Sequence, residues 1–80
     1  MKLKLHEAIV VVLLKKENRM ASLNVITDEI NERGLYFQKD GSPTHAGQIR
    51  MRTYPTTKTG KQHTDLFEFI KPDKVKLKNL

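Results

Sequence analysis

The chain has 80 residues, with fifteen lysine and arginine residues against nine aspartate and glutamate residues, and a formal net charge of +6. This length fits one domain that is only just large enough to form its own apolar core. The absence of cysteine excludes disulfide bonds and thiolate metal sites, and a hydrophobic content of 38% is too high for a disordered tail. The longest apolar run, residues 8–14, is too short to cross a bilayer. We therefore expect a small soluble domain in the cytoplasm, with a polyanion as the first partner to consider.

The positive charge is unevenly distributed along the sequence. Residues 1–43 carry seven basic and six acidic residues, whereas residues 44–80 carry eight basic and three acidic ones. Such a basic half is either an ordinary solvated surface or a surface that binds a polyanion. The arrangement of helices and strands has to distinguish these two interpretations. The segment 44–64 contains no acidic residue and four basic ones: Arg50, Arg52, Lys58 and Lys61.

The first predicted helix runs from about His6 to Lys16. Its apolar residues cover most of the helix circumference, which predicts a buried central helix, although its β-branched residues would also suit a strand. Lysines 15 and 16 fit the last turn of a helix, where cations are favourable. The segment lacks the small-residue cleavage site of a secretory signal.

The second predicted helix has clear boundaries. Ser22 is a suitable N-cap, and Gly34 can end the helix in a left-handed conformation, with Leu35 contacting Ile30. Helical spacing divides its side chains into an apolar face and an acidic face that we do not expect to lie along a phosphate backbone. The apolar face comprises Leu23, Ile26 and Ile30, and the acidic face comprises Asp28, Glu29 and Glu32.

The third predicted helix runs from Pro43 to about Tyr54. Ser42 would cap it, proline suits its first position, and Pro55 would stop it. A helical wheel places Arg50 on the inner side, packing its stem or pairing with an acidic residue of the second helix, Asp28 or Glu32. The inner side comprises Ala46, Ile49, Arg50 and Thr53, and the outer side Thr44, His45, Gln48, Met51 and Arg52.

The last part of the chain predicts a loop followed by two strands. Residues 55–64 contain no apolar residue and read as a loop, and residues 65–70 and 75–78 alternate as strands around a turn at 71–74. Met20-Ala21 can add a short third strand. Three helices followed by a β-hairpin define an α+β fold of the winged helix-turn-helix type, in which the hairpin is the wing. We expect residues 1–80 to form a single domain of this kind.

The sequence also resembles the HARE-type winged-helix domains over nearly its whole length. Such domains occur with restriction endonucleases and chromatin regulators and at the N-terminus of the bacterial RNA polymerase delta subunit. The resemblance implies a module associated with DNA or transcription, while the wing turn Pro72-Asp73, Val75 and the length of loop 55–64 depart from the family pattern. The matching segments are His6-Glu7-Ala8-Ile9, Thr27 to Leu35, Gly41-Ser42-Pro43, Gln48-Ile49 and Phe67.

The fold predicts how duplex DNA would be bound. The third helix of a helix-turn-helix enters the major groove, where Gln48 matches adenine and Arg52 matches guanine. Thr44 and His45 lie at its leading end. Each residue also has a plainer interpretation, as a solvated side chain or, on the hairpin, as a lysine that discourages edge-to-edge pairing. The residues expected to contact phosphates are Lys58, Lys61, Lys74, Lys76 and Lys78.

Catalysis is not expected. The histidines His6, His45 and His63 lack metal-ligand spacing, and Thr59-Gly60-Lys61-Gln62 is an incomplete phosphate loop. No nucleophile–base pair is recognisable, and we expect no cofactor, metal, membrane or small-molecule substrate. The alternative to DNA binding is a protein-interaction module that docks to RNA polymerase or another DNA-associated protein. Its contacts would be the acidic helix 22–33, Met51 and Tyr54.

Overall fold

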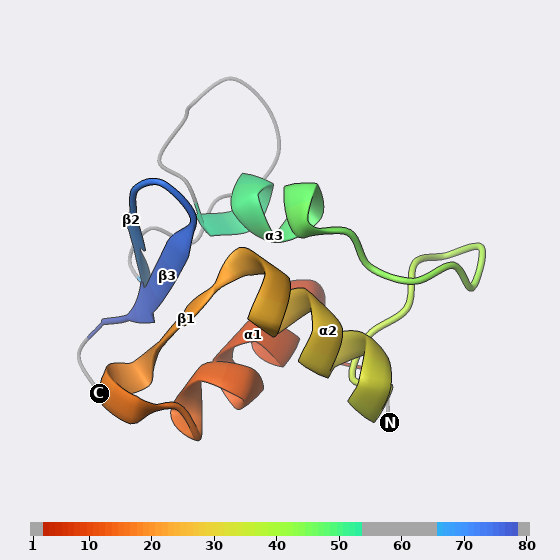
Figure 1. The fold of residues 1–80 in the computed structure, drawn as a ribbon. Helices are drawn as coiled ribbons and strands as arrows, with labels where there is room; N and C mark the ends of the chain where they lie inside the picture. Colours follow the sequence, from red (N-terminus) through yellow and green to blue (C-terminus); the bar gives the residue numbers. More distant parts are fainter. Residues whose placement is uncertain (1–2, 54–65, 79–80) are drawn as a thin grey trace.

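A computed structural model describes residues 3–53 and 66–78 and shows an α+β fold, as predicted (Figure 1). Three α-helices pack against a three-stranded antiparallel sheet. The helices are α1 (Leu5–Leu14), α2 (Leu23–Arg33) and α3 (Ala46–Thr53), a short 3-10 helix η1 (Glu17–Arg19) follows α1, and the strands are β1 (Met20–Ser22), β2 (Phe67–Ile70) and β3 (Lys74–Leu77).

The sheet has the order β1-β3-β2, so that the last strand in the sequence is the central strand. The short strand predicted at Met20-Ala21 is confirmed, because β1 pairs with β3. The predicted alternation in β3 is also confirmed, since Val75 and Leu77 are buried and the two lysines between and before them are exposed. The pairs facing the helices are Phe67 with Leu77 and Phe69 with Val75; Ala21 joins Val75 from β1.

The helix α1 is the centre of the molecule, as its apolar sequence predicts. It begins one residue earlier and ends two residues earlier than expected, and Lys15 follows it as the C-cap. The Glu7 carboxylate accepts a hydrogen bond from the Lys4 backbone N–H at 2.7 Å, which satisfies one donor at the helix start. Its fully buried residues pack against α2, α3 and β3; the core residues of α1 are Leu5, Ala8, Ile9, Val12 and Leu13.

The predicted boundaries of α2 are confirmed by its caps. The Ser22 hydroxyl accepts from the Val25 backbone N–H at 3.2 Å. At the other end Gly34 has a φ of 62°, and the Leu35 N–H donates to the Ile30 carbonyl at 3.0 Å, which is the Schellman pattern. The first backbone N–H of α2, that of Leu23, donates to the Asp73 carbonyl at 2.7 Å, so the turn between β2 and β3 is tied to the start of this helix.

Replacement of Ser22 by alanine is expected to lower the free energy of unfolding by about 1 kcal/mol, because the Val25 N–H loses its side-chain acceptor. Ser22→Asp retains an acceptor and should restore most of this loss. Urea denaturation of the two variants and the wild type measures the difference. Equal destabilisation by both substitutions would show that the hydroxyl does not act as a cap.

The predicted start of α3 is wrong, because the helix begins at Ala46 and not at Pro43. The hydroxyl that was expected to cap it, that of Ser42, donates instead to the Asp40 carboxylate at 2.6 Å. The backbone of Thr44 is held by the Asn31 side chain of α2, whose amide bonds both its N–H and its carbonyl. These contacts hold residues 42–44 outside the helix, and His45 becomes the residue that precedes it.

The apolar core is continuous from the helices to the sheet. Besides the residues of α1 it contains the buried face of α2 and one residue of α3, Ile49. Two of the three threonines that are buried within the described residues, Thr27 and Thr53, donate their hydroxyls to the carbonyl four residues earlier, at 2.7 and 2.9 Å. Their polar groups are therefore satisfied without leaving the core. From the sheet the core receives Phe67, Val75 and Leu77.

Candidate nucleic-acid interface

The outer face of the sheet carries two exposed lysines on its central strand. Lys74 and Lys76 point away from the helices, since the residues that alternate with them are buried. Lys76 lies opposite Met20 on one side and Glu68 on the other, and Lys74 lies between Ser22 and Ile70. The two lysines thus sit in the middle of a mixed polar and apolar surface that is built from all three strands.

The central position of β3 removes one plainer explanation of these lysines. Lysines on an edge strand can prevent pairing with another sheet. Because β3 is paired on both sides, by β1 and by β2, it has no free edge to protect. Edge protection therefore does not explain these lysines, which leaves an ordinary solvated face and a polyanion contact as the two interpretations.

Within the part of the chain that the structure describes, Lys74 and Lys76 form no ion pair. Residues two apart on a strand have their Cα atoms about 7 Å apart. This separation is of the same order as that between successive phosphates of a nucleic-acid strand. Like charges so placed repel each other; Glu68, opposite Lys76 on β2, offsets part of this repulsion, and a bound polyanion would relieve the rest.

The exposed face of α3 differs from the one predicted. Arg50 was expected to point inward, but it is exposed, and its guanidinium carbon lies 5.7 Å from the centroid of the Phe69 ring in β2. This distance is within the range of a cation–π contact, so the arginine is positioned between α3 and the sheet. Met51 beside it is 52% exposed. The buried residues of α3 are Ile49 and Thr53, so these side chains define its inner face.

Two residues predicted to reach DNA bases are unable to do so, one because it is buried and one because its amide is engaged within the protein. Thr44 was expected at the leading end of the third helix, but it precedes α3 and is only 3% exposed. Gln48 was expected to project outward, but it is half-buried. Its amide donates to the Gln38 side chain at 3.0 Å and accepts from the His45 N–H at 3.0 Å. Within the described residues the Thr44 hydroxyl has no hydrogen-bond partner, but its burial keeps it from a base edge, and the Gln48 amide is engaged at both ends. The candidate interface therefore does not include these two side chains.

Besides these two and the lysines of β3, three of the residues predicted to contact DNA lie within the described residues: His45, Arg52 and Lys78. His45 is exposed immediately before α3, and Arg52 is half-buried within it. Lys78 is exposed directly after β3, where its backbone N–H donates to the Leu66 carbonyl at 2.8 Å. The predicted contacts Lys58 and Lys61 lie outside the described residues, as do the predicted loop and Tyr54.

The connector between α2 and α3 contains polar residues whose role the sequence did not reveal. Gln38 donates to the Ser42 hydroxyl and to the Pro43 carbonyl, at 2.9 and 2.8 Å. Asp40 accepts from the hydroxyl and from the backbone N–H of Ser42, and these hydrogen bonds hold the pKa of its carboxyl below the ordinary value. The connector therefore places the start of α3 by side-chain hydrogen bonds. The sequence does contain one signal of this arrangement: Asn31 is an amide residue of α2 near the connector, and its side chain can bond the backbone there.

The acidic exterior of α2 is partly neutralised within the protein. Glu29 forms an ion pair with Lys16 and lies 4.0 Å from the Arg33 guanidinium. Asp28 and Glu32 are exposed, as predicted. The acidic groups that remain available on this helix are therefore these two, and they belong to a different element from the lysines of the sheet.

Within the described ranges, 3–53 and 66–78, no group of acidic residues and histidines is arranged to hold a metal ion. None of the helices there is long and apolar enough to span a membrane. No protein-family model, curated protein or solved structure matches the chain. The chemistry of the surface is therefore what points to a function.

Proposed function

We propose that the chain is a duplex-DNA-binding module of the winged-helix type. In this proposal α2 and α3 form the helix-turn-helix, and β2 and β3 form the wing. The third helix faces the major groove, and the lysines of β3 contact phosphates. The residues that we assign to the interface are His45, Arg50, Arg52, Lys74, Lys76 and Lys78.

The observation that carries the proposal is the pair of lysines on the central strand. Lys74 and Lys76 are exposed, and among the described residues they lack an ion-pair partner. Edge protection does not account for them because β3 is central. Phosphate binding accounts for both their exposure and their spacing.

The proposed binding tolerates many DNA sequences. Base edges are read by side chains with free donors and acceptors, whereas phosphates are contacted by any exposed cation. The amide of Gln48 is bonded at both ends within the protein, and Thr44 is buried. We therefore expect affinity to come mainly from phosphate contacts, with little discrimination between duplexes.

Fluorescence anisotropy with two unrelated labelled duplexes tests the proposal. We expect both duplexes to bind with similar affinity and to weaken tenfold or more from about 50 mM to about 200 mM salt, because binding releases counterions. A duplex-independent affinity with this salt dependence supports the proposal. No salt-sensitive binding at low ionic strength overturns it, and would favour a protein contact through Asp28, Glu32 and the exposed Met51.

A further inference from the structure

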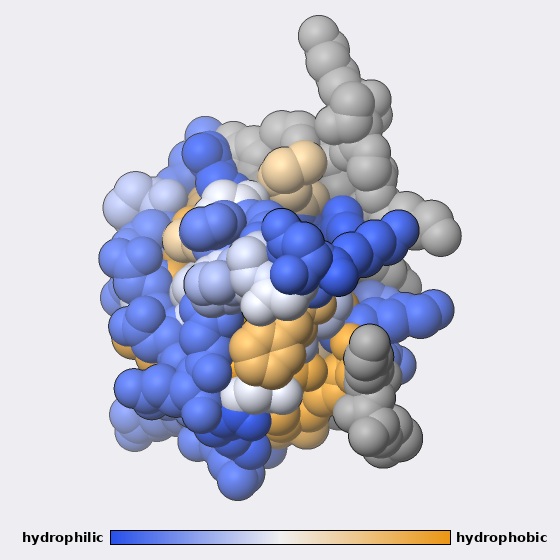
Figure 2. Space-filling view, turned by 90° about the vertical axis from the view of Figure 1, so that its right-hand side faces the viewer, coloured by the Kyte–Doolittle hydropathy of each residue, from blue (hydrophilic) through white to orange (hydrophobic). Residues whose placement is uncertain are grey.

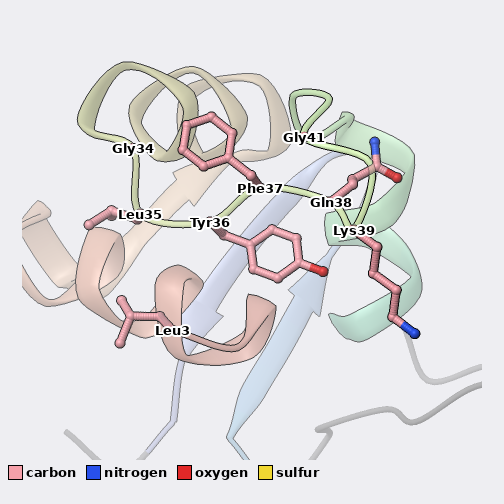
Figure 3. A pocket seen from close by; sticks show the side chains of 8 residues that line it. All are labelled: Leu3, Gly34, Leu35, Tyr36, Phe37, Gln38, Lys39 and Gly41. Carbon is pink, nitrogen blue, oxygen red and sulfur yellow. The ribbon is translucent and has the colours of Figure 1, made fainter. Parts of the chain in front are cut away.

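A pocket with apolar walls lies at the end of α2, in the region of the chain that leads away from the sheet. It has a volume of about 570 Å³. Figure 2 views this side of the molecule and shows apolar surface interrupting a mostly hydrophilic face. Figure 3 shows that the pocket is built from the segment after α2 together with Leu3, which precedes α1. The residues that line it are Leu3, Gly34, Leu35, Tyr36, Phe37, Gln38, Lys39 and Gly41.

The most exposed apolar side chain of this pocket lies beside the end of the helix. Phe37 is 54% exposed, and its ring is next to Gly34 (Figure 3). A Cβ atom at Gly34 would lie 3.7 Å from the ring, and the φ of 62° there favours glycine. The ring is therefore an exposed apolar wall at the end of α2.

The backbone beside the pocket has free hydrogen-bonding groups. Residues 35–38 belong to no helix or strand, and Figure 3 shows them running as an open stretch of chain along the pocket. The Leu35 N–H is bonded to α2 and the Gln38 N–H to Ser42. Within the described residues, the N–H and carbonyl groups of Tyr36 and Phe37 have no hydrogen-bond partner. A partner with a backbone of its own could pair with them, as a peptide does when it adds to an exposed strand.

The charge at the pocket selects the kind of partner. Lys39 is exposed and is the one charged residue among those that line it. The nearby Asp40 carboxylate is ionised, since its hydrogen bonds from Ser42 hold its pKa low, but it is turned to Ser42 and is not among the residues that line the pocket. An occupant with carboxylates beside an apolar anchor would therefore meet a complementary charge at the pocket.

A nucleobase fits the same pocket less well. Recognition of a base edge requires free donors and acceptors, and the side-chain amide here, that of Gln38, is already bonded to Ser42, Pro43 and Gln48. The apolar walls and the free backbone groups suit a polypeptide better. We propose that this pocket binds an acidic peptide segment in an extended conformation, with one aromatic or aliphatic side chain inserted between Leu35, Tyr36 and Phe37.

Selection from a displayed library of random decapeptides, followed by fluorescence anisotropy with the selected peptides, tests the proposal. We expect enrichment of sequences that combine aspartate or glutamate with one large apolar residue. Phe37→Ala should weaken their binding tenfold or more, since it removes the apolar wall. Lys39→Glu should weaken it about three- to tenfold at low salt, and the difference should shrink as salt increases.

Two matched controls separate the pocket from other surfaces. Met51→Ala removes a comparably exposed apolar side chain on α3 and should leave peptide binding unchanged. Lys76→Ala affects the proposed DNA interface and should also leave it unchanged, so that failure of one site is distinguishable from failure of the other. Thermal unfolding followed by circular dichroism checks that Phe37→Ala remains folded, as expected for a side chain that is half exposed.

The results that overturn the proposal are equally specific. They are a selection without enrichment, enrichment of basic peptides, or selected peptides whose affinity does not depend on Phe37. Binding of a labelled single-stranded dodecathymidylate that is lost in Phe37→Ala would also overturn it, by assigning the pocket to a nucleic acid. Amide shifts of Tyr36 and Phe37 on peptide addition, measured by nitrogen-15 NMR, should identify the backbone groups involved.

Discussion

Simultaneous replacement of Lys74 and Lys76 by glutamate is expected to weaken duplex-DNA binding about a hundredfold at low salt, because the two proposed phosphate contacts would become two repulsions. The slope of log affinity against log salt should also fall by about two, since two fewer counterions are released. Both side chains are exposed, so the substitution should leave the fold intact. Anisotropy titrations across a series of salt concentrations measure both quantities.

The matched control is a double variant with the same net charge, in which the two substitutions lie elsewhere on the surface. Lys15 and Lys39 are exposed, one after α1 and one in the connector before α3. Their joint replacement by glutamate should reduce affinity less than about threefold if binding is local to the sheet and α3. Equal losses in the two double variants would mean that DNA responds only to net charge, and the assignment of the interface to β3 would then be wrong.

Asn31→Ala is expected to lower the free energy of unfolding by about 2–3 kcal/mol, because it leaves two partly buried backbone groups of Thr44 unpaired. The Asn31 side chain accepts from the Thr44 N–H at 2.9 Å and donates to the Thr44 carbonyl at 3.0 Å. The gain in helix propensity from alanine offsets only about 0.5 kcal/mol of this cost. Urea denaturation measures the change, and amide hydrogen exchange at Thr44 shows whether the connector has opened.

Asn24→Ala is the appropriate control, since Asn24 lies in the same helix and is exposed. Alanine there should be neutral or slightly stabilising because only helix propensity changes. If Asn31→Ala proved as neutral as Asn24→Ala, the side-chain bridge from α2 to the connector would contribute nothing to stability. The start of α3 would then have to be set by packing around Ile49.

The sequence predicted the elements whose signals are local. Ser22 and Gly34 act within one turn of α2, and the alternation of β3 follows directly from which of its residues are apolar. These contacts join residues a few positions apart, or depend on a pattern of period two, so a single sequence reveals them.

The start of α3 could not be predicted from such signals. Ser42-Pro43 is a good local helix start, but the tertiary contact from Asn31 and the side chain of Asp40 hold these residues in another conformation. Gln48 was misassigned for the same reason, because its partner Gln38 is ten residues away in the chain. Arg50 was wrongly assigned to the inner face of α3, because its guanidinium lies over the ring of Phe69, a residue of the sheet. Polar residues of a connector thus determined which side chains the candidate interface contains.

The position of β3 has a consequence for how the molecule assembles. Within the described residues, β1 and β2 do not pair with each other; each pairs with β3, the last of the three strands in the sequence. During synthesis the helices can form by local contacts, whereas the sheet has to wait until β3 is available. The pairing of β2 with β3 is then local, but that of β1 with β3 spans most of the chain. Lys74 and Lys76 lie on this closing strand. A polyanion that binds them in the folded state alone would therefore stabilise the strand that joins the beginning of the chain to its end.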